Sequence, residues 1–131
     1  MSLRSRPRVV EAHTRKKTVV LRAVRVLFER DPDPDASYLD QHELSERRAV
    51  YESGQFFFVS ARAEADVVIE GILQTLESGG FSGVESDSDE EYIDAIAADE
   101  WAGLRGVLKA VGVSTDQLPL EVDPKWIEWR M

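Results

Sequence analysis

The sequence contains no cysteine, which excludes disulfide bonds and thiolate metal sites and gives no sign of an oxidising compartment. It also lacks any apolar run of about 18 residues or more, the length that a membrane-spanning helix needs. The only two histidines, His13 and His42, are far apart in the chain and do not form a metal-binding pair. The first residues, MSLRSRPRVVEAHTRKK, are basic and polar, without the apolar core of a secretory signal. These absences predict a cytoplasmic protein, and nothing in the sequence predicts a metal or a cofactor.

The chain is acidic, but its charge is unevenly distributed. Its net charge is −9 over 131 residues, yet residues 1–30 hold nine Lys or Arg and only two acids. Residues 31–131 hold seven Lys or Arg and twenty-three acids, so this part should repel nucleic acid. A chain of this length can bury one hydrophobic core. We therefore expect a basic, unstructured tail over residues 1–16 and a single α+β domain over residues 17–131.

Strand patterns occur in the first half of that domain. Residues 17–29 are rich in β-branched side chains, and residues 56–69 alternate between apolar and polar side chains with a period of two. The apolar face of the second segment includes Ala61, Ala63 and Ala65, which leave room for a helix or for the ring of Trp101. Glu70-Gly71 then predicts a two-residue hairpin turn into a third strand over residues 72–76.

Helical patterns frame these strands. Residues 37–53 predict a short helix that ends at Gly54, and residues 88–111 predict a long helix that ends at Gly112. Ser88 and Glu91 have the spacing of a capping box at the start of the long helix. The sequence therefore predicts an antiparallel sheet of three to four strands, packed against one long C-terminal helix, with a second, shorter helix. We expect the tail from Ser114 onwards to lie on the domain surface, held there by Trp126 and Trp129.

The stretch SGGFSGVESDSDEEY, residues 78–92, invites comparison with phosphate-binding loops. Its glycines match neither common phosphate motif, and there is no Lys or Arg between Arg62 and Arg105. Five carboxylates occupy the place where a phosphate would bind and would repel it. A simpler interpretation is that the glycines let the third strand leave the sheet and turn into the long helix.

These acids exceed what helix capping requires, and they are the candidate site. A functional acidic face would bind a basic surface of another protein; the alternatives are a solvated surface or an acidity shared by all proteins of the host cell. The residues proposed for this face are Glu85, Asp87, Asp89, Glu90, Glu91 and Asp94.

Other sites are weaker candidates. DPDPDASYLDQHE resembles the start of a calcium loop, but Ala36 stands where such a loop needs glycine and His42 where it needs glutamate. Two further functions stay open: contact with nucleic acid through the arm from Arg4 to Lys17, and enzymatic action on a small molecule in a cleft beside Arg62. An exposed edge strand would also favour a homodimer. A non-enzymatic interaction protein without cofactors remains our main prediction.

Three segments carry a resemblance: SYL at residues 37–39, LQTLESGG and GVESDSDEEY. Together they resemble a family of small acidic bacterial and phage proteins with a similar SGGxxGxESDSDEEY-like stretch before a helix, over residues 37–39 and 56–110. At Phe81 and Ser82 this chain departs from the leucine and tryptophan of that pattern. The resemblance implies an association with plasmids and phages and an accessory or inhibitor role, and it supplies no catalytic residue.

Overall fold

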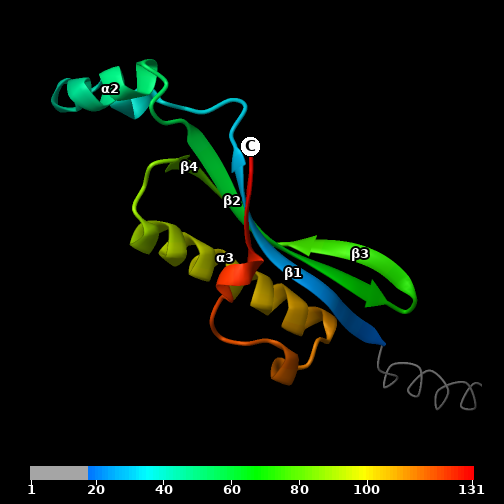
Figure 1. Ribbon diagram of the computed structural model, residues 1–131. Coiled ribbons are helices and arrows are strands. Elements are labelled where there is room, and N and C mark those ends of the chain that lie inside the picture. The colour runs from blue at the N-terminus through cyan, green and yellow to red at the C-terminus, as the bar shows by residue number, and fades with distance from the viewer. Residues whose placement is uncertain (1–17) are drawn as a thin grey trace, which may run out of the picture.

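The computed structural model describes residues 18–131, and its central feature is the pairing of two long antiparallel strands. β1 (Val19–Arg30) and β2 (Phe58–Ile69) have 12 residues each and pair from Val19 opposite Ile69 to Arg30 opposite Val59. Around this pair a mixed five-stranded sheet is completed by β3 (Ile72–Glu77), β4 (Phe81–Glu85) and β5 (Ile127–Arg130), as Figure 1 shows in part. The protein is therefore α+β, as the sequence predicted.

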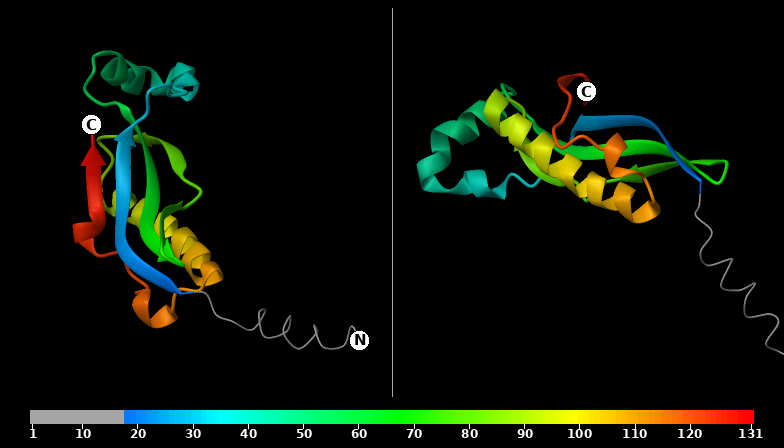
Figure 2. Two further views of the ribbon diagram at one scale, coloured as in Figure 1. Left: turned by 90° about the vertical axis from the view of Figure 1, so that its right-hand side faces the viewer. Right: turned by 90° about the horizontal axis from the view of Figure 1, so that it is seen from below.

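One long helix covers one face of this sheet. Helix α3 (Glu90–Val111) crosses β2 diagonally, while the short helix α2 (Ser45–Glu52) lies with two 3₁₀ turns in a small lobe beyond the end of β1 and β2 (Figures 1 and 2). The 3₁₀ turns in the described part of the chain are η2 (Ser37–Asp40), η3 (His42–Leu44), η4 (Thr115–Gln117) and η5 (Pro124–Trp126). No helix among residues 18–131 is long and apolar enough to cross a membrane.

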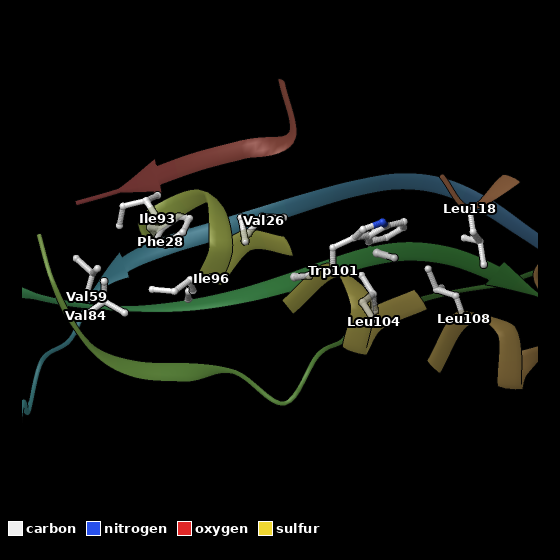
Figure 3. Close-up of a cluster of buried hydrophobic side chains, with 14 of the residues drawn as sticks. Val26, Phe28, Val59, Val84, Ile93, Ile96, Trp101, Leu104, Leu108 and Leu118 are labelled. Carbon is white, nitrogen blue, oxygen red and sulfur yellow. The ribbon is translucent and has the colours of Figure 1, made fainter. Parts of the chain in front are cut away.

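The alternating pattern of β2 places its small side chains beneath α3. Ala61, Ala63 and Ala65 are all buried in one cluster with Trp101 and Leu104 of the helix (Figure 3). These three alanines, neighbours on one face of the strand, leave space on the sheet for a large ring, and the indole of Trp101 fills it. The Nε1 of the indole donates a hydrogen bond to the carbonyl of Pro119 at 2.8 Å. The alanines thus lie beneath both the helix and the ring of Trp101, which the sequence offered as alternatives.

The hairpin turn between β2 and β3 is also as predicted. Ile69 pairs with Ile72, so Glu70 and Gly71 are the two turn residues. Both have positive φ angles, 49° and 83°, as the tight turn that matches strand twist requires.

The glycine-rich stretch has a different role from the one predicted. The third strand does not leave the sheet: β4 continues along the same edge of β2 that β3 occupies. Between the end of β3 and the start of β4 the edge has one residue more than the facing part of β2. Gly80 accommodates this extra residue with a φ of 86°. Gly83, with a φ of 79°, does the same at a second irregularity inside β4. The glycines thus make bulges in an edge strand.

The long helix begins later than predicted, and its cap is a different residue. Its first residue is Glu90, and Asp89 is the N-cap, with a side chain that accepts a hydrogen bond from the backbone N–H of Tyr92 at 2.8 Å. The predicted capping box is therefore wrong, because the hydroxyl of Ser88 donates to the carbonyl of Glu85 instead. The predicted stop is correct: Gly112 is left-handed, with a φ of 107°.

The C-terminal segment corrects the prediction of a purely antiparallel sheet. After α3 the chain returns along the sheet, and β5 pairs in parallel with β1, so that Trp129 lies opposite Phe28. Their rings stack with centroids 4.7 Å apart, and Trp126 meets Trp101 edge to face at 5.0 Å. Both tryptophans anchor the segment, as predicted, but they anchor a fifth strand of the sheet.

The predicted helix over residues 37–53 is broken. Gln41 is extended, with φ −65° and ψ 139°, and separates η2 from η3 and α2. Leu39, which precedes this break, is buried against Phe56 and Phe58, and the three side chains form a second, small hydrophobic core. The predicted basic tail, residues 1–16, lies outside the described residues.

Trp101→Ala should lower the free energy of unfolding by about 3–5 kcal/mol, because it empties the largest buried side-chain volume of the core. Urea unfolding followed by circular dichroism measures the change. Trp129→Ala is the control: this residue is 42% exposed, so the loss should be clearly smaller. Equal losses for the two variants would contradict this view of the core.

Candidate functional site

The six acids predicted to form one surface divide into two groups in the structure. Glu85 ends β4 and Asp87 follows it, and both are already engaged by Arg47 of α2. The other four belong to the start of α3 and are exposed to solvent: Asp89, Glu90, Glu91 and Asp94.

Arg47 connects the α2 lobe to the loop between β4 and α3. Its guanidinium donates to Glu85 Oε1 at 3.2 Å and to Asp87 Oδ2 at 2.9 Å, and it also contacts Asp87 Oδ1. The same guanidinium lies 3.7 Å from the ring centroid of Phe56, a cation–π contact. The hydroxyl of Tyr38 in η2 donates to Glu85 Oε2. Two residues of the lobe thus converge on one carboxylate at the end of the sheet.

The charges of this cluster stabilise one another. Hydrogen bonds from Arg47 hold the pKa of Asp87 below its ordinary value, and the bonds to Asp87 and Glu85 raise the pKa of Arg47. Burial, together with the bond to Glu85, raises the pKa of the Tyr38 hydroxyl. Asp87 and Arg47 are therefore both charged at neutral pH, while the hydroxyl of Tyr38 keeps its proton and stays a hydrogen-bond donor.

A hollow lies beside this cluster, over the start of α3. It is a shallow depression, open to solvent, with a volume of about 420 Å³, and it is lined by Tyr38, Glu85, Asp89 and Tyr92, with Gly83 and Ser88 between them. The rings of Tyr38 and Tyr92 are 38% and 47% exposed. Two accessible aromatic rings between two carboxylates form a site suited to a cationic side chain.

The remaining acids of α3 extend from this hollow along the helix. Of the ion pairs formed between residues 18–131, none involves Asp89, Glu90, Glu91 or Asp94. Asp94 borders a second, more apolar hollow of about 280 Å³ between α3 and the C-terminal segment, where Leu120 is 77% exposed. Their negative charge is therefore available to a partner.

Arg62, the residue proposed to mark a cleft, lies on the sheet face opposite α3. Its guanidinium donates to Glu29 at 3.1 Å and to Glu64 at 2.7 Å. Glu64 also accepts from Arg25, which in turn binds Asp66. Burial alone would raise the pKa of Glu64, but the bonds from Arg62 and Arg25 outweigh it and keep that pKa low. Arg62 therefore serves an ion network across β1 and β2, and a bound anion would have to compete with it.

The aspartate-rich segment before η2 makes turns. Asp31 accepts from the backbone N–H of Asp33, and Asp35 accepts from that of Ser37, both at 3.0 Å. Among residues 18–131 no group of three or more His, Asp or Glu side chains is placed to hold a metal ion. The arm from Arg4 to Lys17 is outside the described residues.

Sequence reasoning missed the role of Arg47, which lies about forty positions from its two partners. Local spacing rules do not reach that far, because they describe neighbours within one element. The SYL segment was noticed, but its pairing with Glu85 was not predicted.

No family model, curated protein or solved structure matches the chain. The resemblance to acidic phage and plasmid proteins therefore stays a prediction.

Arg47→Met should return the pKa of Asp87 towards its ordinary value, because it removes the guanidinium that lowers it and keeps much of the side-chain bulk. A carbon-detected NMR titration of the Asp87 carboxyl measures this pKa. Since the pKa is lower in the folded chain, the ion pair stabilises the fold above the ordinary Asp pKa of about 3.9. That contribution is lost as the pH falls through the lowered value.

Arg48→Met is the matched control for this titration. Arg48 is the neighbouring residue on α2, and it pairs with Asp40 and Glu52 instead. It should leave the pKa of Asp87 unchanged and have little effect on stability, because ion pairs between exposed side chains contribute little. An Asp87 titration that is the same in both variants would show that Arg47 does not control this carboxyl.

Proposed function

We propose that this protein is a non-enzymatic accessory or inhibitor protein that binds a basic surface of a partner protein. The binding surface is the Tyr38–Tyr92 hollow together with the acids of the first turns of α3, Glu90, Glu91 and Asp94. The observation that carries the proposal is the position of these unpaired carboxylates beside two accessible tyrosine rings. The resemblance to phage and plasmid proteins supports the accessory role.

The two groups of acids then have different tasks. Glu85 and Asp87 hold the α2 lobe through Arg47 and shape one wall of the hollow. The free acids of α3 attract the partner and orient it, while the tyrosine rings receive one of its Lys or Arg side chains. Charges of this kind mainly accelerate association and select the partner, so binding should weaken as the salt concentration rises.

The pKa of Asp87 also favours binding over catalysis. A catalytic carboxyl usually has a pKa raised towards neutrality by burial or by a like charge. The pKa of Asp87 is shifted in the opposite direction, because hydrogen bonds from Arg47 stabilise its charged form.

The test is a pull-down from a lysate of the host with the wild type and a triple variant, Glu90→Lys, Glu91→Lys and Asp94→Lys. The control carries the same charge change at exposed acids outside the surface, Glu43→Lys, Glu70→Lys and Asp116→Lys. We expect a basic protein that the wild type and the control retain, that the triple variant loses, and that elutes with salt.

Lysine in the first turn of α3 opposes the helix dipole by about 0.3–1 kcal/mol per residue, so the melting temperature of each variant is checked. The corresponding glutamine and asparagine variants keep the helix start closer to neutral and should lose most of the same partner. A partner that the folded triple lysine variant still retains at high salt would refute the proposal.

A further inference from the structure

One part of the sheet edge is left open in a way that the other parts are not. β5 forms the edge beside β1, and it is short and carries Glu128 and Arg130. β4 continues the edge that begins with β3, and the bulges at Gly80 before it and at Gly83 inside it twist this part of the edge away from a neighbouring strand. Short length, charge and bulges are the devices by which proteins block unwanted strand pairing. Both β5 and β4 have at least one of them.

β3 has none of these devices except its last residue, Glu77. Its six residues, ILQTLE, contain no proline, lysine or glycine, and they pair with β2 without a break. Ile72 and Leu73 are 64% and 67% exposed and point to opposite faces of the sheet. An unbroken edge strand with apolar residues on both faces is a template for another strand.

The backbone of β3 presents alternate residues to that strand. The turn makes Ile69 and Ile72 a hydrogen-bonded pair, so the N–H and C=O groups of Ile72, Gln74 and Leu76 face β2. The groups of Leu73, Thr75 and Glu77 therefore point outward.

We propose that a second copy of this chain binds here, with the two β3 strands antiparallel about a two-fold axis at Gln74. In this register Leu73 of each copy exchanges backbone hydrogen bonds with Thr75 of the other, about four in all. The two-fold axis is perpendicular to the sheet, so the faces covered by α3 in the two copies lie on the same side. The two five-stranded sheets therefore join into one continuous sheet.

The side chains of β3 are complementary to themselves in this register. On the α3 face, Ile72 of one copy lies opposite Leu76 of the other, on both sides of a central pair of Gln74 amides. On the other face, Leu73 lies opposite Thr75. Glu77 meets Gly71 of the second copy, so no acid faces an acid in a chain whose described residues hold twenty-four Asp or Glu. This match favours a second copy over an unrelated strand.

The surroundings leave space for the second copy. Two views show the β2–β3 hairpin projecting past the C-terminal end of α3, with the α2 lobe at the opposite end of the molecule (Figures 1 and 2). The antiparallel arrangement therefore keeps the two lobes and the two acidic helix starts apart. A strand of six residues is only about 20 Å long. It buries less than the roughly 800 Å² per partner of stable complexes, so the dimer should dissociate on dilution.

Sedimentation equilibrium of the full chain over a range of concentrations tests this proposal. We expect the mass to rise from one chain towards two as the concentration increases. Leu73→Lys should abolish the rise, because it replaces the apolar side chain opposite Thr75 of the second copy with a charge, at an exposed position that the monomer tolerates. Leu120→Lys is the matched control, on an even more exposed leucine away from β3, and it should dimerise like the wild type.

Cross-linking tests the register, and the absence of cysteine makes single substitutions unambiguous. In the proposed dimer, Gln74 of one copy lies opposite Gln74 of the other. These two residues exchange no backbone hydrogen bonds, and in such a pair the two Cβ atoms are about 4.5–5.5 Å apart. Gln74→Cys should therefore form a disulfide-linked dimer under mild oxidation at least tenfold faster than Leu73→Cys or Leu120→Cys. A wild type that stays monomeric at all concentrations would overturn the proposal. So would a dimer that Leu73→Lys leaves intact, or equal cross-linking by the three cysteine variants.

Discussion

The pairing of β1 with β2 is the interaction on which the rest of the structure depends. Every other strand joins one side of this pair, and α3 lies across it. The three alanines at alternate positions of β2, Ala61, Ala63 and Ala65, make this arrangement feasible, because they let the helix and the ring of Trp101 approach the backbone of the sheet. The same strands extend beyond the helix at both ends. One end carries the α2 lobe, which borders the Tyr38–Tyr92 hollow, and the other end carries the β2–β3 hairpin (Figure 1). Both proposed binding surfaces therefore depend on the length of β1 and β2.

The two faces of β2 fix the register of the sheet by opposite means. One face buries alanine and valine beneath α3, while the other carries Arg62, Glu64 and Asp66 in an ion network with β1. A slip by one residue would exchange the faces and place the charges of the network in the core. Glu64 is only 6% exposed and binds two guanidinium groups. Such a network adds little net stability compared with apolar side chains, but removing one partner leaves a buried charge uncompensated. Its main contribution is therefore specificity of pairing.

The features that the sequence predicted correctly are those set by neighbours in the chain. The alternation in β2, the Glu70-Gly71 turn and the end of α3 at Gly112 each follow from a few adjacent residues. The errors arose where distant contacts compete with local preference. Ser88 has the spacing of an N-cap, yet its hydroxyl binds the carbonyl of Glu85 and Asp89 caps the helix. β5 has only four residues, and its parallel pairing depends on the stacking of Trp129 on Phe28, about a hundred positions away. For the candidate site, the sequence predicted the acids, but it did not predict that Arg47 forms ion pairs with two of them, Glu85 and Asp87.

The acidic surface lies at the start of the long helix, whereas β3 runs from beside the middle of the helix, where Ser78 binds Glu100, past its C-terminal end (Figure 1). From Glu90 to Glu100 the helix rises about 15 Å, whereas the charge of exposed groups is screened over about 8 Å at physiological ionic strength. The carboxylates at the start of α3 therefore contribute little to the potential at β3, and the acids that act on strand pairing are those at the ends of β3 itself, Glu70 and Glu77. The salt responses should differ for the same reason. Binding at the acidic surface depends on charge and weakens in salt, while pairing of β3 rests on backbone hydrogen bonds and apolar contacts that salt leaves largely intact.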